Sequence, residues 1–160
     1  MPGPSPTRQL LVPLLALLII LILCATPLTT TAAGTPYAAL SGSILYAAPT
    51  GTGDCLTWAN ACTLQTALTG AVASDEIWVQ AGTHKPTTAN DRTATFTLVN
   101  GVAVYGGFAG TETLRTERDP VANVSVLSGD IDNNDIVDAN GVVTSTVNIV
   151  GSNSYHVVTG

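Results

Sequence analysis

The hydrophobic positions fall into one long apolar run near the N-terminus, at residues 10–25, followed by a series of short runs. The short runs are rich in β-branched and aromatic residues and are bounded by turn-forming residues, which is the pattern of short β-strands. We predict strands at Ile44–Ala47, Glu76–Gln80, 93–99, 102–105, 124–127 and 155–158, with one or two more within 142–150. This succession predicts an all-β fold of the sandwich, barrel or solenoid type.

One segment has a helical period instead. Within 63–73, apolar residues recur at the spacing of one helix face, and Thr63 is a suitable N-cap. The apolar face consists of Leu64, Ala67, Leu68, Ala71 and Val72. We therefore predict a short amphipathic helix between the first and second strands.

The spacing of three strands bears on the choice of fold. Segments 77–82, 102–107 and 124–129 each read as a strand, a small residue and then Gly, and their starts are 25 and 22 residues apart. A solenoid repeats a strand at about this interval, because each coil stacks on the one before. A sandwich also has short strands, but it gives no reason for this repeated corner. The interval leaves both architectures open.

The apolar run at 10–25 has the arrangement of a secretory signal. Arg8 precedes it, Pro27 ends it, and Thr31, Ala32 and Ala33 form a small-residue cleavage sequence, so we predict cleavage after Ala33. Two alternatives are a retained membrane anchor and lipidation at Cys24; the run is shorter than the roughly 20 apolar residues of a membrane span. The predicted organisation is a signal peptide at 1–33, a flexible leader at 34–43 and a folded domain at 44–160.

The net charge and the cysteines of the residues after the predicted signal peptide indicate the partners and the redox environment of the chain. Four cations and eleven acids remain after Ala33, a net charge of −7, which disfavours nucleic acid and anionic membrane surfaces as partners. Cys55 and Cys62 are an even pair of cysteines around a short loop. Because exported proteins fold in an oxidising environment, we predict a disulfide between them. With His84 and His156 far away in sequence, two cysteines make a poor metal site.

Several of these segments resemble a known family. Residues 75–86 and 100–112 resemble the first coils of exported bacterial right-handed parallel β-helix proteins with a pectin-lyase-like fold, including the polymorphic outer-membrane type. Residues 58–61 with the 64–72 helix resemble the cap of such proteins, and 153–158 resembles the run into a further coil. The resemblance implies the start of a right-handed parallel β-helix with an N-terminal capping helix. Because a strand directly precedes Gly160, we expect the helix to be incomplete there or covered by a partner.

The acidic segment 130–138 is the sharpest candidate for ligand binding. Alternating oxygen side chains are the donors that calcium prefers, and Asp130, Asp132, Asn134 and Asp138 are the predicted Ca²⁺ ligands. The segment departs from an EF-hand loop, since Asp135 occupies the position of the turn glycine and Gly141 that of the closing Glu. A solvated acidic turn is the alternative.

The sequence offers no complete catalytic constellation. A polysaccharide lyase would need a base beside a carboxylate cluster, and the candidates are Lys85, Arg92, Arg115 and Arg118. We interpret the charges at 115–119 as surface ion pairs, His84 as exposed, and the aromatic residues Trp58, Trp78 and Tyr105 as packing groups rather than a sugar platform.

We therefore predict an exported surface or extracellular β-helix scaffold, structural, adhesive or glycan-binding, with carbohydrate or cell-surface components as partners. Contact with a membrane is expected only through an uncleaved N-terminal segment. The alternative is the N-terminal part of a pectate-lyase-like lyase or hydrolase with its active site in downstream coils.

Overall fold

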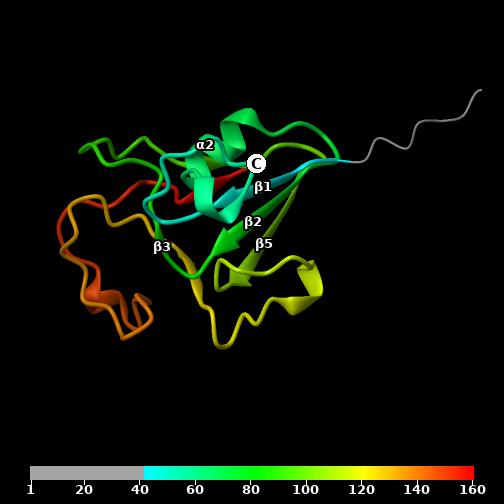
Figure 1. Ribbon diagram of the computed structural model, residues 1–160. Coiled ribbons are helices and arrows are strands. Elements are labelled where there is room, and N and C mark those ends of the chain that lie inside the picture. The colour runs from blue at the N-terminus through cyan, green and yellow to red at the C-terminus, as the bar shows by residue number, and fades with distance from the viewer. Residues whose placement is uncertain (1–41) are drawn as a thin grey trace, which may run out of the picture. The chain divides into compact units, whose positions relative to one another are not determined.

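Three parallel strands form the largest sheet in the described part of the protein (Figure 1). The computed structural model describes residues 42–160, so the predicted signal segment with its cleavage after Ala33 lies outside the described residues, as does most of the predicted leader. The sheet contains β1 (Ile44–Ala47), β2 (Glu76–Gln80) and β5 (Ala103–Phe108), in that order. Its register aligns Leu45, Ile77 and Val104 in one row and Tyr46, Trp78 and Tyr105 in the next.

Two smaller sheets are also parallel. Strand β3 (Gly82–His84) pairs with β6 (Ser125–Leu127), and β4 (Phe96–Thr97) pairs with β7 (Val158–Thr159). The chain thus passes through β2, β3 and β4 and then through β5, β6 and β7, and each strand of the second series pairs with its counterpart in the first.

Helix α2 (Leu64–Gly70) lies against β1, β2 and β4. It begins as predicted, because the Thr63 hydroxyl accepts a hydrogen bond from Thr66 N at 3.2 Å. It ends earlier than predicted, at Gly70, and Val72 is 64% exposed instead of facing the core. Among the residues that the structure describes, no helix has the length and apolar character of a membrane span.

The core lies between α2 and the strands. Its fully or nearly fully buried side chains come from β1, β2, β4 and α2: Ala47, Ile77, Val79, Phe96, Leu64, Ala67 and Leu68. Within residues 42–160, three single-turn 3-10 helices lie outside this core: η2 (Trp58–Asn60), η3 (Arg115–Glu117) and η4 (Thr146–Asn148).

The outer edge of β1 is closed by the chain that follows it. Tyr46 N donates to Cys55 O at 2.8 Å, Cys62 N donates to Tyr46 O at 3.1 Å, and Ala48 N donates to Cys62 O at 2.8 Å. The Cys55–Cys62 disulfide is confirmed, with 4.7 Å between the two Cα atoms. It holds the segment that covers this edge.

Two glycines predicted to end a strand lie inside β5. The Gly107 N–H donates to the Ser125 hydroxyl at 3.1 Å, and a side chain on Gly106 would meet Ser125 Cβ at 3.0 Å. Gly107 also has φ +96, and a Cβ there would lie 2.9 Å from the Pro120 backbone. These glycines permit close approach by the next strand and its connection, and they do not stop β5.

The region 142–150 contains no strand, and the prediction of one or two strands there is wrong. Its backbone groups are bound in other ways: Val142 N donates to Asp138 Oδ1, Val150 N donates to Asp135 Oδ1, and Asn148 O accepts from Ile136 N. Residues 128–157 form a long excursion between β6 and β7, drawn in orange to red in Figure 1.

Candidate functional site

The acidic segment lies at the start of this excursion and is joined to β3. Lys85, directly after β3, donates from Nζ to Asn133 Oδ1 at 2.6 Å and lies 3.5 Å from Asp130 Oδ2. Both side chains of the ion pair are mostly buried, with exposures of 21% for Lys85 and 9% for Asp130. A protein ammonium group therefore neutralises the innermost carboxylate of the segment.

The carboxylate of Asp130 also organises the turn that follows it. Its oxygens accept hydrogen bonds from Asn134 N at 3.2 Å and Asp135 N at 3.4 Å. Burial alone would raise the pKa of Asp130, but the backbone donors and the Lys85 charge together outweigh it and hold the pKa below its ordinary value. Asp130 is thus kept ionised.

The other acids of the segment bind backbone amides. Asp132 Oδ2 accepts from Ser152 N at 2.8 Å, and Asp135 Oδ1 accepts from Val150 N at 2.6 Å. Asp138 Oδ1 accepts from Asn140 N and Val142 N, both at 2.9 Å. The bonds of Asp132 and Asp135 connect the first and last parts of the 128–157 excursion, whereas those of Asp138 are local.

The predicted calcium ligands are therefore engaged within the protein. Asn134 Nδ2 donates to Asp132 Oδ2 at 3.0 Å, whereas the Asp138 carboxylate binds amides of its own turn. Within residues 42–160, no group of three or more His, Cys, Asp or Glu side chains is placed to hold a metal ion. A pocket of about 240 Å³ lies beside Lys85, Asp130 and Asp135. Calcium binding here stays a prediction.

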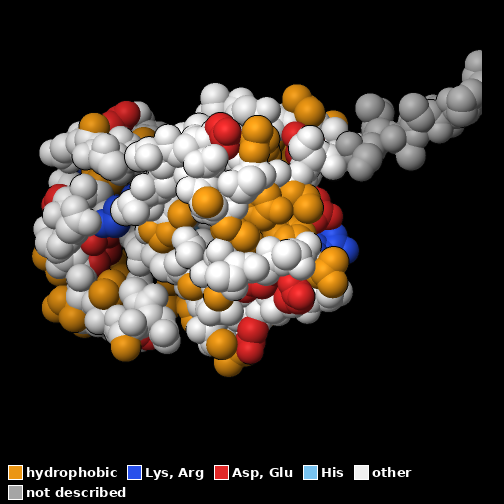
Figure 2. All heavy atoms as spheres, in the orientation of Figure 1, with side chains coloured by type: hydrophobic (Ala, Val, Ile, Leu, Met, Phe, Trp, Pro, Cys, Tyr) orange, Lys and Arg blue, Asp and Glu red, His pale blue; other side chains and the backbone are white. Residues whose placement is uncertain are grey.

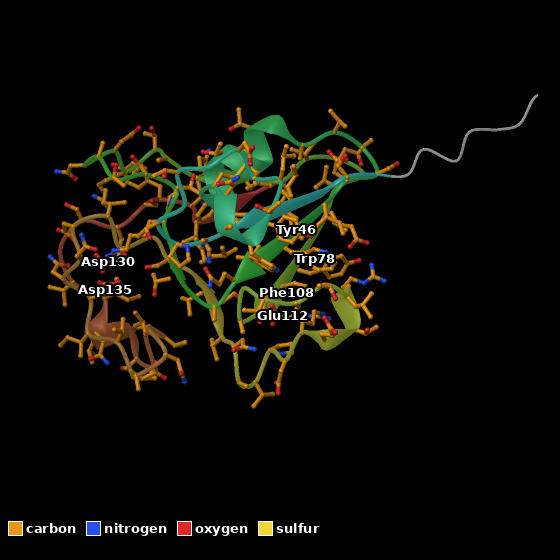
Figure 3. All side chains as sticks on the ribbon, in the orientation of Figure 1. Tyr46, Trp78, Phe108, Glu112, Asp130 and Asp135 are labelled. Atoms are coloured by element: carbon orange, nitrogen blue, oxygen red, sulfur yellow. A yellow bond between two sulfur atoms is a disulfide. The ribbon has the colours of Figure 1, made fainter. Side chains whose placement is uncertain are left out.

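A cluster of aromatic rings covers the outer face of the β1–β2–β5 sheet (Figure 3). Trp78 stacks on Phe108 with 4.7 Å between ring centroids, and Tyr46 meets Trp58 edge-on at 4.8 Å. Trp78 and Phe108 are buried, whereas Tyr46, Trp58 and Tyr105 are half-buried. The prediction of packing is thus confirmed for Trp78, and the other rings combine packing with an exposed surface.

Charged groups lie along the edge of this cluster. Arg115 Nη1 donates to Glu76 Oε1 at 2.6 Å and to the Tyr105 hydroxyl at 3.1 Å, while Trp78 Nε1 donates to Glu76 Oε2 at 2.9 Å. The Arg115 guanidinium lies 4.8 Å from the Tyr105 ring centroid, and that of Arg118 lies 5.6 Å from it. Figure 2 shows hydrophobic side chains gathered over this sheet with acidic and basic groups beside them.

Glu112 fixes the loop beside the cluster. Its carboxylate accepts three backbone hydrogen bonds, from Ala109, Gly110 and Thr111, at 2.6, 2.9 and 2.9 Å. Burial alone would raise its pKa, but the backbone donors together lower it. Its carbonyl accepts from Trp58 Nε1 at 2.9 Å, which sets the orientation of that ring. Sequence reasoning missed this residue, because the only local pattern that marks Glu112 is a Glu after a Gly-containing turn.

His84 is buried, with 2% exposure, and the prediction of an exposed residue is wrong. It belongs to β3, and its Nε2 lies 2.8 Å from Gln80 O, so the neutral ring donates this hydrogen bond. Burial lowers the pKa of His84, and the bond to Gln80 only partly offsets this. His84 serves packing at the corner between β2 and β3.

The four candidate lyase bases are bound to other groups. Lys85 and Arg115 pair with Asp130 and Glu76, respectively. Arg118 lies over the Tyr105 ring and donates to Gly106 O at 3.1 Å. Arg92 donates to Asn153 O at 2.7 Å and lies over the Tyr155 ring at 4.5 Å. Each cation thus has a structural partner.

Comparison of the chain with protein-family models, with curated proteins and with solved structures gives no match.

Proposed function

We propose that residues 44–160 form the capped start of a parallel β-helix in an exported surface or extracellular scaffold protein, and that the outer face of its β1–β2–β5 sheet contacts glycans. The observation that carries the proposal is the repeated strand order, in which β5, β6 and β7 pair in parallel with β2, β3 and β4. A sandwich of hairpins would pair neighbouring strands antiparallel.

The disulfide supports an extracellular setting, because oxidising compartments are where such bonds form and persist. The acidic balance of the chain and the engagement of the four cations that follow Ala33 favour a scaffold over a polysaccharide lyase, which needs a free base beside its substrate.

The aromatic face supports the glycan part of the proposal. Aromatic rings bind the apolar faces of sugars, and polar groups at their rim bind the hydroxyls. Tyr46, Trp58 and Tyr105 are half-buried and held in place, and Glu76 and Arg115 lie beside them. The face is thus organised before any ligand arrives.

A titration with a panel of neutral and acidic oligosaccharides, followed by NMR of the tryptophan indole N–H groups, tests this function. We expect the Trp58 signal to shift more than that of Trp78, because Trp78 is 2% exposed. Tyr105→Ala should weaken binding about tenfold, in line with the loss of one stacked ring.

The chain provides a matched control for this variant. Tyr155 also lies under an arginine, Arg92, but belongs to another surface. Tyr155→Ala should leave oligosaccharide binding unchanged. Equal effects of the two variants, or no indole shift with any oligosaccharide, would contradict glycan binding at this face.

A further inference from the structure

A small pocket adjoins the aromatic face at the end of β1. It has a volume of about 270 Å³ and is lined by residues of two segments, 48–53 and 58–61. The second segment lies within the loop that the Cys55–Cys62 disulfide closes, and this loop covers the outer edge of β1. The pocket therefore lies at the β1 edge of the sheet, opposite the edge formed by β5.

The two segments that line the pocket are bonded to each other through their backbones. Gly53 N donates to Ala61 O at 2.9 Å, and Cys55 N, just beyond the pocket, donates to Asn60 O at 2.9 Å. Gly51 and Gly53 permit this close approach, because a Cβ on either glycine would collide with the backbone of the opposite segment. Backbone pairing and the disulfide thus form the pocket before any ligand arrives.

Trp58 belongs both to the pocket and to the aromatic cluster. Its ring meets Tyr46 at 4.8 Å and Phe108 at 5.6 Å between centroids, and its Nε1 donates to Glu112 O at 2.9 Å. These contacts fix the ring, which is only half-buried, so part of it stays exposed. A ligand on the aromatic face can therefore extend past Trp58 into the pocket.

The polar side chains of the pocket are uncharged. Thr50, Thr52 and Asn60 are exposed and offer hydroxyl and carboxamide groups, which both donate and accept hydrogen bonds, as sugar hydroxyls do. No charged residue is among the described residues that line the pocket. The neighbouring Asp54 accepts a hydrogen bond from Leu56 N at 3.1 Å. An ionised ligand group would thus find no counter-ion in the pocket.

The volume of the pocket limits what it can hold. Pockets for drug-sized ligands occupy roughly 300–1,000 Å³, and this one is slightly smaller, which suits one pyranose ring. The apolar face of such a ring can pack on Trp58 while its hydroxyls bind Thr52 and Asn60. A pocket for one unit accepts the end or a branch of a glycan, whose other units then lie on the aromatic face.

We propose that this pocket binds a single neutral sugar unit at the end or a branch of a glycan held on the aromatic face. This role rests on the proposed function and adds to it the class of sugar that is recognised. The two fail separately, because a glycan can bind the aromatic face without entering the pocket.

The test uses trisaccharides of glucose, galactose and mannose, each paired with a form whose terminal unit is oxidised to the uronic acid. In NMR titrations of the isotope-labelled protein, at least one neutral trisaccharide should shift the Thr52 and Asn60 amides and the Trp58 indole. Its acidic form should bind about tenfold more weakly, because the carboxylate has no partner in the pocket. Shifts at Tyr105 without shifts at Thr52 and Asn60, or equal binding of both forms, would overturn the pocket and leave the proposed function standing. No shift with any trisaccharide would overturn both.

Variants of Thr52 test the pocket independently. Thr52→Val should weaken binding of the neutral trisaccharide about fivefold through the loss of one hydrogen bond, whereas Thr144→Val, at an exposed site on the 128–157 excursion, should not. Thr52→Arg should reverse the preference in favour of the uronic acid, because it supplies the missing counter-ion. An unchanged preference in Thr52→Arg, or equal effects of the two valine variants, would contradict the proposal.

Discussion

The ammonium group of Lys85 occupies the position beside Asp130 that a bound cation would take in an acidic loop, at 3.5 Å from Asp130 Oδ2 and 2.6 Å from Asn133 Oδ1. It joins β3 to the excursion that follows β6. This contact links the first and second series of strands through side chains, in addition to the backbone hydrogen bonds between β3 and β6.

Lys85→Met should lower the free energy of unfolding by about 1–3 kcal/mol, because it leaves a mostly buried carboxylate without its cation. Chemical denaturation measures the loss. A double-mutant cycle with Asp130→Asn isolates the pair, and a coupling energy of about 1 kcal/mol is expected. Additive effects of the two changes would show that the contact contributes nothing.

Calcium, if it enters the segment at 130–138, has to compete with Lys85. We therefore expect millimolar Ca²⁺ to raise the melting temperature of Lys85→Met more than that of the unaltered protein. Magnesium at the same concentration serves as the control, since it prefers a stricter octahedral geometry. Identical melting curves with and without calcium in both proteins would exclude calcium binding by the 130–138 segment.

The disulfide should contribute about 2–3 kcal/mol to stability, the loop-closure value for cysteines seven residues apart. The Cys55→Ser, Cys62→Ser double variant should lose this amount in denaturant titrations. Adding a reductant should destabilise the unaltered protein to the same degree and leave the double variant unaffected. A loss under about 0.5 kcal/mol would mean that the hydrogen bonds to β1 hold the segment alone.

The burial of His84 predicts that the free energy of unfolding decreases in mild acid. Burial lowers its pKa from 6.5 in the folded state, so the unfolded chain takes up a proton first as the pH falls below 6.5. Stability should therefore decrease from there down to the folded-state pKa. His84→Gln should remove this dependence, and His156→Gln, at an exposed site, should retain it. Equal pH profiles for the two variants would contradict this role.

The elements that the sequence predicts well are those fixed by local patterns. The bounds of β1 and β2 match the prediction, and Thr63 caps α2 as its side chain suggested. The Cys55–Cys62 pairing was also predictable, because no other cysteine follows Ala33, the end of the predicted signal segment.

The elements that it missed depend on distant contacts. β3 is three residues long and exists because β6, more than forty residues later, pairs with it. Gly106 and Gly107 lie within β5 where Ser125 and the backbone of Pro120, respectively, leave no room for a side chain. The neighbours of Asp130 and Glu112 are backbone amides, and no residue pattern reveals which amides a carboxylate will reach.

Nuclear Overhauser contacts across the strands measure whether β5, β6 and β7 pair in parallel with β2, β3 and β4. We expect parallel-sheet contacts between the backbones of Thr83 and Val126 and of Phe96 and Val158, and along the row of Leu45, Ile77 and Val104. Close Hα–Hα contacts between neighbouring strands, as in an antiparallel sandwich, would contradict it.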